Sequence, residues 1–209
     1  EAKLLELVAQ ADVVLDCTDN FATRYAINRA CVAQRTPLVS GAAILTHGQL
    51  SVFDFRREDA PCYNCLFSEE SEAPELRCAT TGVFAPLVGI IGTLQAAEAI
   101  KLLAGIDRGL SGKLLFVNAL DMNFMTSELS KDPSCCVCGD NPRRIETPAT
   151  ACASSSAAAA RAAAPLRKYR FMTFSLSVPC HHDARRPDMC AQRAAISPQC
   201  IIRNEFMVK

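Results

Sequence analysis

The sequence predicts an α/β fold, and three observations support this prediction. Residues 12–16 form a short apolar run of the kind found in buried parallel strands, and apolar residues then recur at helical spacing over 25–31. A second strand starts at residue 38, so strand, loop and helix alternate. A later apolar helical segment, 87–104, lies between two Cys-x-x-Cys pairs, which is metal-ligand spacing.

The first third of the chain predicts a strand followed by a helix. Residues 1–11 are typical of the end of an amphipathic helix, so we expect the chain to begin within a domain. The strand at 12–16 ends in a polar stretch, where Asp19 or Asn20 can cap the following helix. Thr36-Pro37 ends that helix because proline disfavours helical conformation in the residue before it.

A hairpin follows the second strand. Residues 38–40 resume the strand pattern, and the runs 42–45 and 49–55 flank the turn 46–48. The segment 61–81 is polar, acidic and without periodicity, which predicts a long loop, and loops of this length are usually functional or disordered.

The middle of the chain predicts one helix and two more strands. We expect 87–104 to be a buried helix that ends at Gly105, followed by strands at 113–120 and 124–129. No apolar run approaches the roughly 20 residues of a membrane span, and no secretion signal opens the sequence. A cytoplasmic protein is therefore the expectation.

Composition separates a domain from a tail. The 209 residues hold 22 basic and 22 acidic side chains, so net charge gives no reason to expect nucleic acid or a membrane as partner. Residues 1–144 carry 13 basic and 18 acidic residues, whereas 145–209 carry 9 and 4. The second segment contains an alanine-rich run and no apolar periodicity, so we predict a domain over 1–144 and a low-complexity or disordered tail over 145–209.

The two Cys-x-x-Cys pairs predict a zinc site. Each pair presents two sulfur atoms on one turn, and zinc favours four thiolates in a tetrahedron. A closed site of this kind is structural and would pin the end of the domain onto the central loop. The alternative is four core or redox cysteines, and Cys136 lies inside the second pair. The expected ligands are Cys62, Cys65, Cys135 and Cys138.

Asp19 is a candidate ligand-binding residue. It follows a predicted parallel strand, and open α/β sheets bind ligands at the carboxyl ends of their strands. A carboxylate there could hold a magnesium ion that bridges nucleotide phosphates. The alternative role, capping the next helix, is equally compatible with its position.

A series of motifs resembles the MoeB/ThiF family of sulfur-carrier adenylyltransferases, relatives of the ubiquitin-activating enzymes. The likeness runs from about residue 11 to 139 in order and at family spacing. The motifs are Asp16-x-x-Asp19-Asn20, Pro61-Cys62-x-x-Cys65-Leu66, Cys78-Ala-Thr-Thr-Gly82-Val83, Ala85-Pro86-Leu87-Val88-Gly89, Gly92-Thr-Leu-Gln-Ala-Ala-Glu98-Ala-Ile-Lys101 and Cys135-x-x-Cys138-Gly139.

The resemblance implies the carboxy-terminal portion of a Rossmann-like adenylation domain. Such enzymes are homodimers that use ATP and magnesium to adenylate the terminal Gly-Gly of a ubiquitin-like sulfur carrier of molybdopterin or thiamine synthesis. Asp19 matches the aspartate associated with magnesium and ATP, and the four cysteines match the zinc ligands. Cys78 matches a loop cysteine that transfers sulfur in some members and is dispensable in others. Arg24 lies in the same stretch as Asp19, where we expect an orienting or structural role.

One family feature is not in the sequence. The family opens with a glycine-rich turn that cradles phosphate through backbone amides, and these 209 residues contain no Gly-x-Gly-x-x-Gly. Gly89 and Gly92 fall in the apolar helix, where close packing is the better explanation. We expect this chain alone to be inactive or impaired. The alternatives are a non-catalytic module that docks the carrier or binds zinc, and a degenerate gene product.

Overall fold

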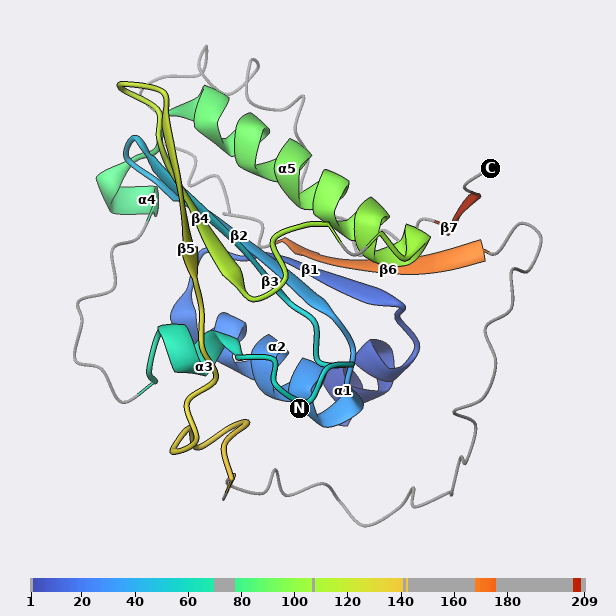
Figure 1. Ribbon diagram of the computed structural model, residues 1–209. Coiled ribbons are helices and arrows are strands. Elements are labelled where there is room, and N and C mark those ends of the chain that lie inside the picture. The colour runs from blue at the N-terminus through green and yellow to red at the C-terminus, as the bar shows by residue number, and fades with distance from the viewer. Residues whose placement is uncertain are drawn as a thin grey trace, which may run out of the picture.

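The computed structural model describes residues 2–69, 78–106, 108–140, 142, 168–175 and 205–207. For 78–79, 168–175 and 205–207 it describes the backbone only. One mixed sheet forms the centre, with helices on both faces, which confirms the predicted α/β fold (Figure 1). The strand order is β5-β4-β3-β2-β1-β6-β7.

The sheet contains both parallel and antiparallel strand pairs. β1 pairs in parallel with β2 and with β6, and every other neighbouring pair is antiparallel. The predicted hairpin is confirmed as β2 and β3, which meet at Ile44 and His47. The strands are β1 (Val13–Cys17), β2 (Leu38–Ile44), β3 (His47–Phe53), β4 (Lys113–Asn118), β5 (Asn123–Glu128), β6 (Lys168–Ser175) and β7 (Glu205–Met207).

Three helices cover one face of the sheet. They are α1 (Ala2–Ala9), α2 (Phe21–Gln34) and the short α3 (Tyr63–Leu66). Val14 of β1, Leu38 of β2 and Phe53 of β3 point to this face and pack with Ile27 of α2. The cysteines Cys62 and Cys135 belong to the same buried cluster.

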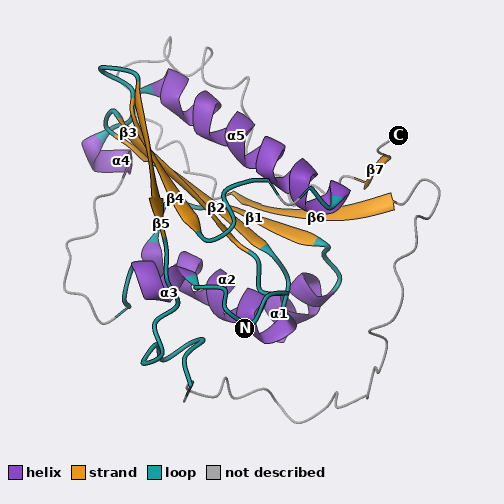
Figure 2. Cartoon of the chain, in the orientation of Figure 1, coloured by secondary structure: helices purple, strands orange, loops and turns teal. Residues whose placement is uncertain are grey.

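A single long helix, α5 (Ala85–Ala104), covers the opposite face (Figure 2). Val13 and Leu15 of β1 point to it, because successive side chains of a strand alternate between faces. Leu87 and Ile91 are the buried residues of its first half. Gly105 ends the helix in the left-handed conformation, as predicted.

The expectation that this helix is buried holds for one face only. Val88 is 49% and Ile100 48% exposed, on the side turned away from the sheet. Gly89 and Gly92 also lie on that side, where a Cβ atom would meet nothing within 4 Å, so the predicted close packing is wrong within this chain. By length and composition α5 could cross a membrane, contrary to the apolar-run analysis, although core helices of soluble proteins meet the same criterion.

Two further predictions need correction. The segment 61–81 is not a loop throughout, because α3 and α4 (Cys78–Thr81) lie within it. The local turns there are too short to show helical periodicity, which hid them from a sequence analysis. The predicted tail, 145–209, lies mostly outside the described residues. Within it, β6 and β7 are described, and β6 extends the sheet beside β1.

Candidate functional site

A buried carboxylate lies near the carboxyl end of β1, beside Ser40 within β2. Asp16 is 1% exposed and accepts hydrogen bonds from the backbone amide and the hydroxyl of Thr18, at 3.0 and 2.7 Å. The hydroxyl of Ser40, on β2, donates to its other oxygen at 3.0 Å. A buried charge is tolerated only when it is paired and hydrogen-bonded, and Arg24 provides the pair at 2.9 Å.

Arg24 ties the β1–α2 loop to β1 and β2. Its guanidinium donates to Asp16, to Ser40 and to two backbone oxygens, those of Thr18 and Gly41. The residue is 5% exposed, so these contacts are shielded from water. This agrees with the orienting or structural role expected for it. The β1–α2 loop is therefore held by a fully bonded charge pair.

Gln95 joins the same edge from the other face of the sheet. Its side-chain amide donates to the backbone oxygens of Asp16 at 2.9 Å and of Val39 at 3.3 Å, and its oxygen accepts from the Cys17 thiol at 3.5 Å. A Cβ atom on Gly41 would lie 2.4 Å from this side chain, so any larger residue there would displace the Gln95 amide from its hydrogen bonds. α5 is thus anchored to the end of β1 and to the first half of β2.

Asp19 lies on the loop that this network holds. Its neighbour Asn20, not Asp19, caps α2, because the Asn20 side chain accepts from the Thr23 amide at 2.8 Å. The capping alternative for Asp19 is therefore wrong. Its side chain is exposed at the carboxyl edge of the sheet, next to the buried Thr18. A ligand role remains a prediction.

The four predicted metal ligands come together. Their sulfur atoms all lie within 4.8 Å of one another. Adjacent sulfurs are 3.4 Å apart for Cys65 and Cys138, 3.7 Å for Cys62 and Cys135, and 3.9 Å for Cys62 and Cys65. Sulfurs around a zinc ion at about 2.3 Å would be about 3.8 Å apart, so this donor set fits a tetrahedral ion.

Tight turns hold the cysteines in position. The amide of Cys65 donates to the oxygen of Cys62 at 3.0 Å, and that of Gly139 to the oxygen of Cys135 at 2.9 Å. A Cβ atom on Gly139 would lie 2.4 Å from a backbone oxygen, so the second turn requires glycine. Hydrogen bonds with Cys138 and Cys62 lower the pKa of the Cys65 thiol, whereas hydrogen bonds with Cys138 and Cys65 raise the pKa of Cys62. Deprotonated sulfur is the form that binds metal.

Asn64 provides an outer layer to the cluster. Its amide nitrogen lies 3.6 Å from the sulfur of Cys135 and 3.6 Å from that of Cys136. Its oxygen accepts from the backbone amide of Glu69 at 3.0 Å. Cys136 is not among the four clustered ligands, and the amide of Asn64 holds its sulfur beside the cluster. Contacts of this type orient metal ligands.

The residues Asp16, Arg24, Ser40 and Gln95 form a network called here the Asp16 edge. The cysteine cluster is joined to this network through α2. Asn28, fully buried on α2, accepts from the amide of Tyr63 at 3.0 Å. Tyr25 and Arg29 reach the segment after the first cysteine pair, bonding the oxygen of Ser68 at 3.2 Å and the carboxylate of Glu69 at 2.9 Å. The helix that carries Arg24 thus also positions the first cysteine turn.

The predicted loop cysteine, Cys78, begins α4, and its side chain lies outside the described residues. The residues after α4 are tied to the β2–β3 turn, where the amide of Leu45 donates to the oxygen of Gly82 at 3.0 Å and that of Phe84 to Leu45 at 2.7 Å. This turn lies at the same edge of the sheet as the end of β1. The backbone of α4 and Asp19 therefore share one edge of the sheet.

Residues 1–137 match the ThiF family. The chain belongs to the ThiF family. Its curated relatives include the molybdopterin-synthase adenylyltransferase of Escherichia coli K12, 47% identical over 142 residues, which are 66% of this chain and 55% of that protein. The sulfur carrier protein ThiS adenylyltransferase of the same organism is 48% identical over 136 residues, 65% of this chain and 53% of that protein. The SAMP-activating enzyme E1 of Haloferax volcanii is 46% identical over 136 residues, 65% and 49%.

This ThiF-family chain spans about half the length of the curated relatives it matches. Solved structures with the same fold include E. coli MccB with MccA-N7isoASN, at a TM-score of 0.54 and 20% identity, covering 67% of this chain and 44% of that one. MccB with ATP gives 0.52 and 19%, covering 66% and 43%. The resemblance to the MoeB/ThiF family is confirmed.

Three residues of the site were given no role in the sequence analysis: Asp16, Gln95 and Asn64. A carboxylate in an apolar strand was one available signal, because a charge there needs a buried partner. The polar Gln95 and Glu98 in an apolar helix were another, since three residues apart they share the face that packs on the sheet. The position of Asn64 against two sulfurs depends on chain folding and has no local signal.

Proposed function

We propose that this chain carries the carrier-docking and aspartate-bearing part of an ATP-dependent sulfur-carrier adenylyltransferase. The observation that carries the proposal is Asp19, an exposed carboxylate fixed at the carboxyl edge of the sheet by the buried pair of Asp16 and Arg24. Ligands of open α/β sheets bind at this edge. Relatives at 47% and 48% identity are named adenylyltransferases, one of them for the sulfur carrier ThiS.

In the proposed reaction the terminal carboxylate of the carrier's Gly-Gly attacks the α-phosphorus of ATP. A carboxyl-oxygen–phosphorus bond forms, the bond to the β-phosphate breaks, and pyrophosphate leaves. Asp19 would hold magnesium, which neutralises charge on the phosphates. Arg24 does not touch the reacting atoms, and it acts by positioning the loop through Asp16. We propose that Cys78, at the start of α4 on the same edge, takes part in sulfur transfer.

The metal at the cysteine cluster is proposed to be zinc in a structural role. Four thiolates with tetrahedral spacing favour zinc, and all four positions are filled by protein sulfur. No open position would remain for substrate. The cluster joins segments 73 residues apart in sequence, from Cys62 to Cys135, so metal binding and folding are coupled.

An exposed apolar edge supports a protein partner. All six residues of β5 are exposed, and β5 is an edge strand of the sheet. Phe124 and Met125 on it are 46% and 55% exposed, and Leu120 and Met122 in the preceding turn are 77% and 58% exposed. Exposed apolar side chains on an edge strand are typical of a docking surface. We propose that the ubiquitin-like carrier binds there.

The outer face of α5 supports the proposed homodimer. Val88 and Ile100 are half-exposed there, and Gly89 and Gly92 leave room for a close neighbour. Small residues allow helices to approach closely, so a second copy could bury this face. We place the protein in the cytoplasm, as expected for carrier-protein chemistry. Light scattering of the metal-loaded protein, with Gly92→Leu as the disrupting variant, tests the dimer.

Calorimetry and ATP–pyrophosphate exchange together test the proposed function. We expect metal-loaded protein to bind a sulfur carrier that ends in Gly-Gly, and Met125→Asp to weaken binding more than Lys3→Asp on the distant α1. We expect carrier-dependent exchange at least a hundredfold slower than that of the E. coli relative, because loss of a single phosphate-binding donor costs about that much. Exchange at the relative's rate would show that the glycine-rich loop is dispensable.

The alternative is a non-catalytic module. Carrier binding with no exchange at any enzyme concentration would favour a docking fragment. If the metal-loaded protein showed neither carrier binding nor ATP–pyrophosphate exchange, it would be a zinc-binding fragment or a degenerate gene product.

A further inference from the structure

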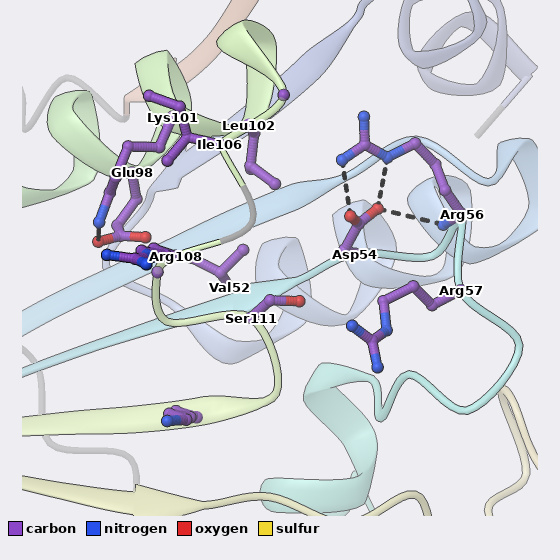
Figure 3. A pocket seen from close by; sticks show the side chains of 13 residues that line it. Val52, Asp54, Arg56, Arg57, Glu98, Lys101, Leu102, Ile106, Arg108 and Ser111 are labelled. Carbon is purple, nitrogen blue, oxygen red and sulfur yellow. Dashed lines mark hydrogen bonds and ion pairs between the residues drawn. The ribbon is translucent and has the colours of Figure 1, made fainter.

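A cavity of about 600 Å³ lies at the edge of the sheet opposite Asp19 (Figure 3). It is bounded by the end of β3, the end of α5 and the loop that enters β4. Its volume falls within the range of small-molecule pockets. The polar and charged residues that line it are Asp54, Arg56, Arg57, Glu98, Lys101, Arg108, Ser111 and Lys113.

The cavity carries an excess of positive charge. Among the lining residues that the structure describes, five side chains are basic and two are acidic. Both acidic groups are already neutralised, Asp54 by two hydrogen bonds of 2.6 Å from Arg56 and Glu98 by its contact with Lys101. Within the described part of the chain, the side chains of Arg108 and Lys113 make no hydrogen bond or ion pair, although the backbone amide of Lys113 donates to Leu110 at 3.0 Å. Two cations therefore remain available to a ligand.

Arg57 adds a third basic side chain to the lining. It pairs with Asp59 at 3.3 Å, but both side chains are more than half exposed. Exposed pairs of this kind contribute about 0–1 kcal/mol, so the pair with Asp59 competes only weakly with a ligand. Figure 3 shows Arg57 on the side of the cavity near Asp54 and the end of β3, and Arg108 on the other side, toward α5. The cations approach the space from separate directions.

The walls of the cavity are fixed by hydrogen bonds. Glu98, 8% exposed, accepts from the amide of Leu110 at 3.0 Å, and a Cβ atom on Gly109 would lie 2.5 Å from its carboxylate. The amide of Gly112 donates to Val52 at 3.1 Å. The last carbonyls of α5 accept from the amides of Gly105 and Ile106, which reduces the negative potential of that helix end. The loop is thus preformed.

We propose that this cavity binds a small molecule that carries a phosphate group. Phosphate presents tetrahedrally arranged oxygens, which cations on separate walls can contact at once, whereas a planar carboxylate matches a single guanidinium fork. The hydroxyl of Ser111 is a further donor on the lining. The volume exceeds that of phosphate alone, so the remainder of the ligand occupies the space beside Val52 and Ile106.

The site is separate from the proposed adenylation site. β3 runs antiparallel to β2, so Phe53 pairs with Leu38 at the start of β2, while Asp16 pairs with Ser40 further toward its end. The cavity and Asp19 therefore lie at opposite edges of one sheet. Failure of either proposal leaves the other standing.

Inorganic phosphate, without magnesium, is the probe that tests the cavity. We expect saturable shifts of the Gly109 and Gly112 amides in heteronuclear NMR spectra of the full chain. The double variant Arg108→Ala/Lys113→Ala should weaken binding about a hundredfold, roughly tenfold for each lost charge. Lys3→Ala, which removes an exposed cation from α1, should change it less than twofold, and so should Asp19→Asn.

The competing ligand classes are part of the same test. Citrate should bind more weakly than phosphate at equal ionic strength, and tighter citrate binding would overturn the assignment in favour of a polycarboxylate. Shifts that do not saturate, or that Lys3→Ala reduces as much as the double variant does, would show non-specific attraction and overturn the site itself.

Discussion

The cysteine cluster and the Asp16 edge are two buried polar centres built in different ways. The cluster takes its four sulfurs from two short turns, each with its own Cys-x-x-Cys spacing. The edge takes Asp16 from β1, Arg24 from α2, Ser40 from β2 and Gln95 from α5. The sulfurs of the cluster surround a single point, whereas the Asp16 edge supports a loop whose residue Asp19 is exposed.

This difference separates structural from functional chemistry. A closed tetrahedral site has every donor directed inward, so its contribution is to folding. The edge has its charge pair inside and Asp19 outside, so its buried contacts fix the position of a group that remains free to meet a ligand. Variants should therefore divide into those that unfold the chain and those that leave it folded without its proposed activity.

Loss of a metal ligand should have the largest effect. Cys135→Ser removes one of four donors, and we expect loss of the bound zinc and unfolding by several kcal/mol, since structural zinc sites contribute directly to folding. Cys136→Ser is the matched control, because Cys136 lies outside the four clustered sulfurs. Zinc content measures the loss of metal, and urea unfolding measures the loss of stability, in each of the two variants. Equal zinc loss in the two variants would contradict the ligand assignment.

Breaking the buried charge pair should come next. Arg24→Leu leaves the carboxylate of Asp16 buried without its cation, and we expect a loss of about 3–5 kcal/mol in the free energy of unfolding. Adding Asp16→Asn should restore part of that loss, because the uncompensated charge is gone. A double variant as unstable as the sum of the two single ones would show that the pair is not coupled.

The outer layer of the cluster should have a smaller effect. Asn64→Ala removes the amide that holds the sulfurs of Cys135 and Cys136. We expect zinc affinity to fall about 10- to 100-fold, with zinc still bound at saturation. Competition with a chromogenic chelator measures the affinity, and Asn123→Ala on the exposed β5 is the control. Unchanged affinity would assign Asn64 to packing alone.

The same division explains what the sequence could predict. The four cysteines are readable because two ligands lie three residues apart on each turn, and the alternation of β1, α2 and β2 is readable from apolar spacing. The bonds of Gln95 to β1 and β2 join residues 79 and 56 apart and leave no local pattern. α5 was expected to be buried because apolar composition does not tell which face meets the sheet.

Substitution of Asp19 should have the smallest effect on stability. Asp19→Asn alters an exposed side chain that does not cap α2, so the free energy of unfolding should stay within about 0.5 kcal/mol of the unchanged chain. Asp16→Asn, three residues earlier and buried, should cost well over 1 kcal/mol. Urea unfolding of the two variants compares them directly. A large loss for Asp19→Asn would place Asp19 among the structural residues.

Paramagnetic NMR with manganese and ATP tests the central claim most directly, because it locates nucleotide-bound metal without requiring turnover. In zinc-loaded protein, manganese with ATP should broaden the backbone amides from Thr18 to Phe21, and Asp19→Asn should abolish that broadening while the protein stays folded. Equal broadening in the Asp19→Asn variant, or none near this loop in the unchanged chain, would contradict the account.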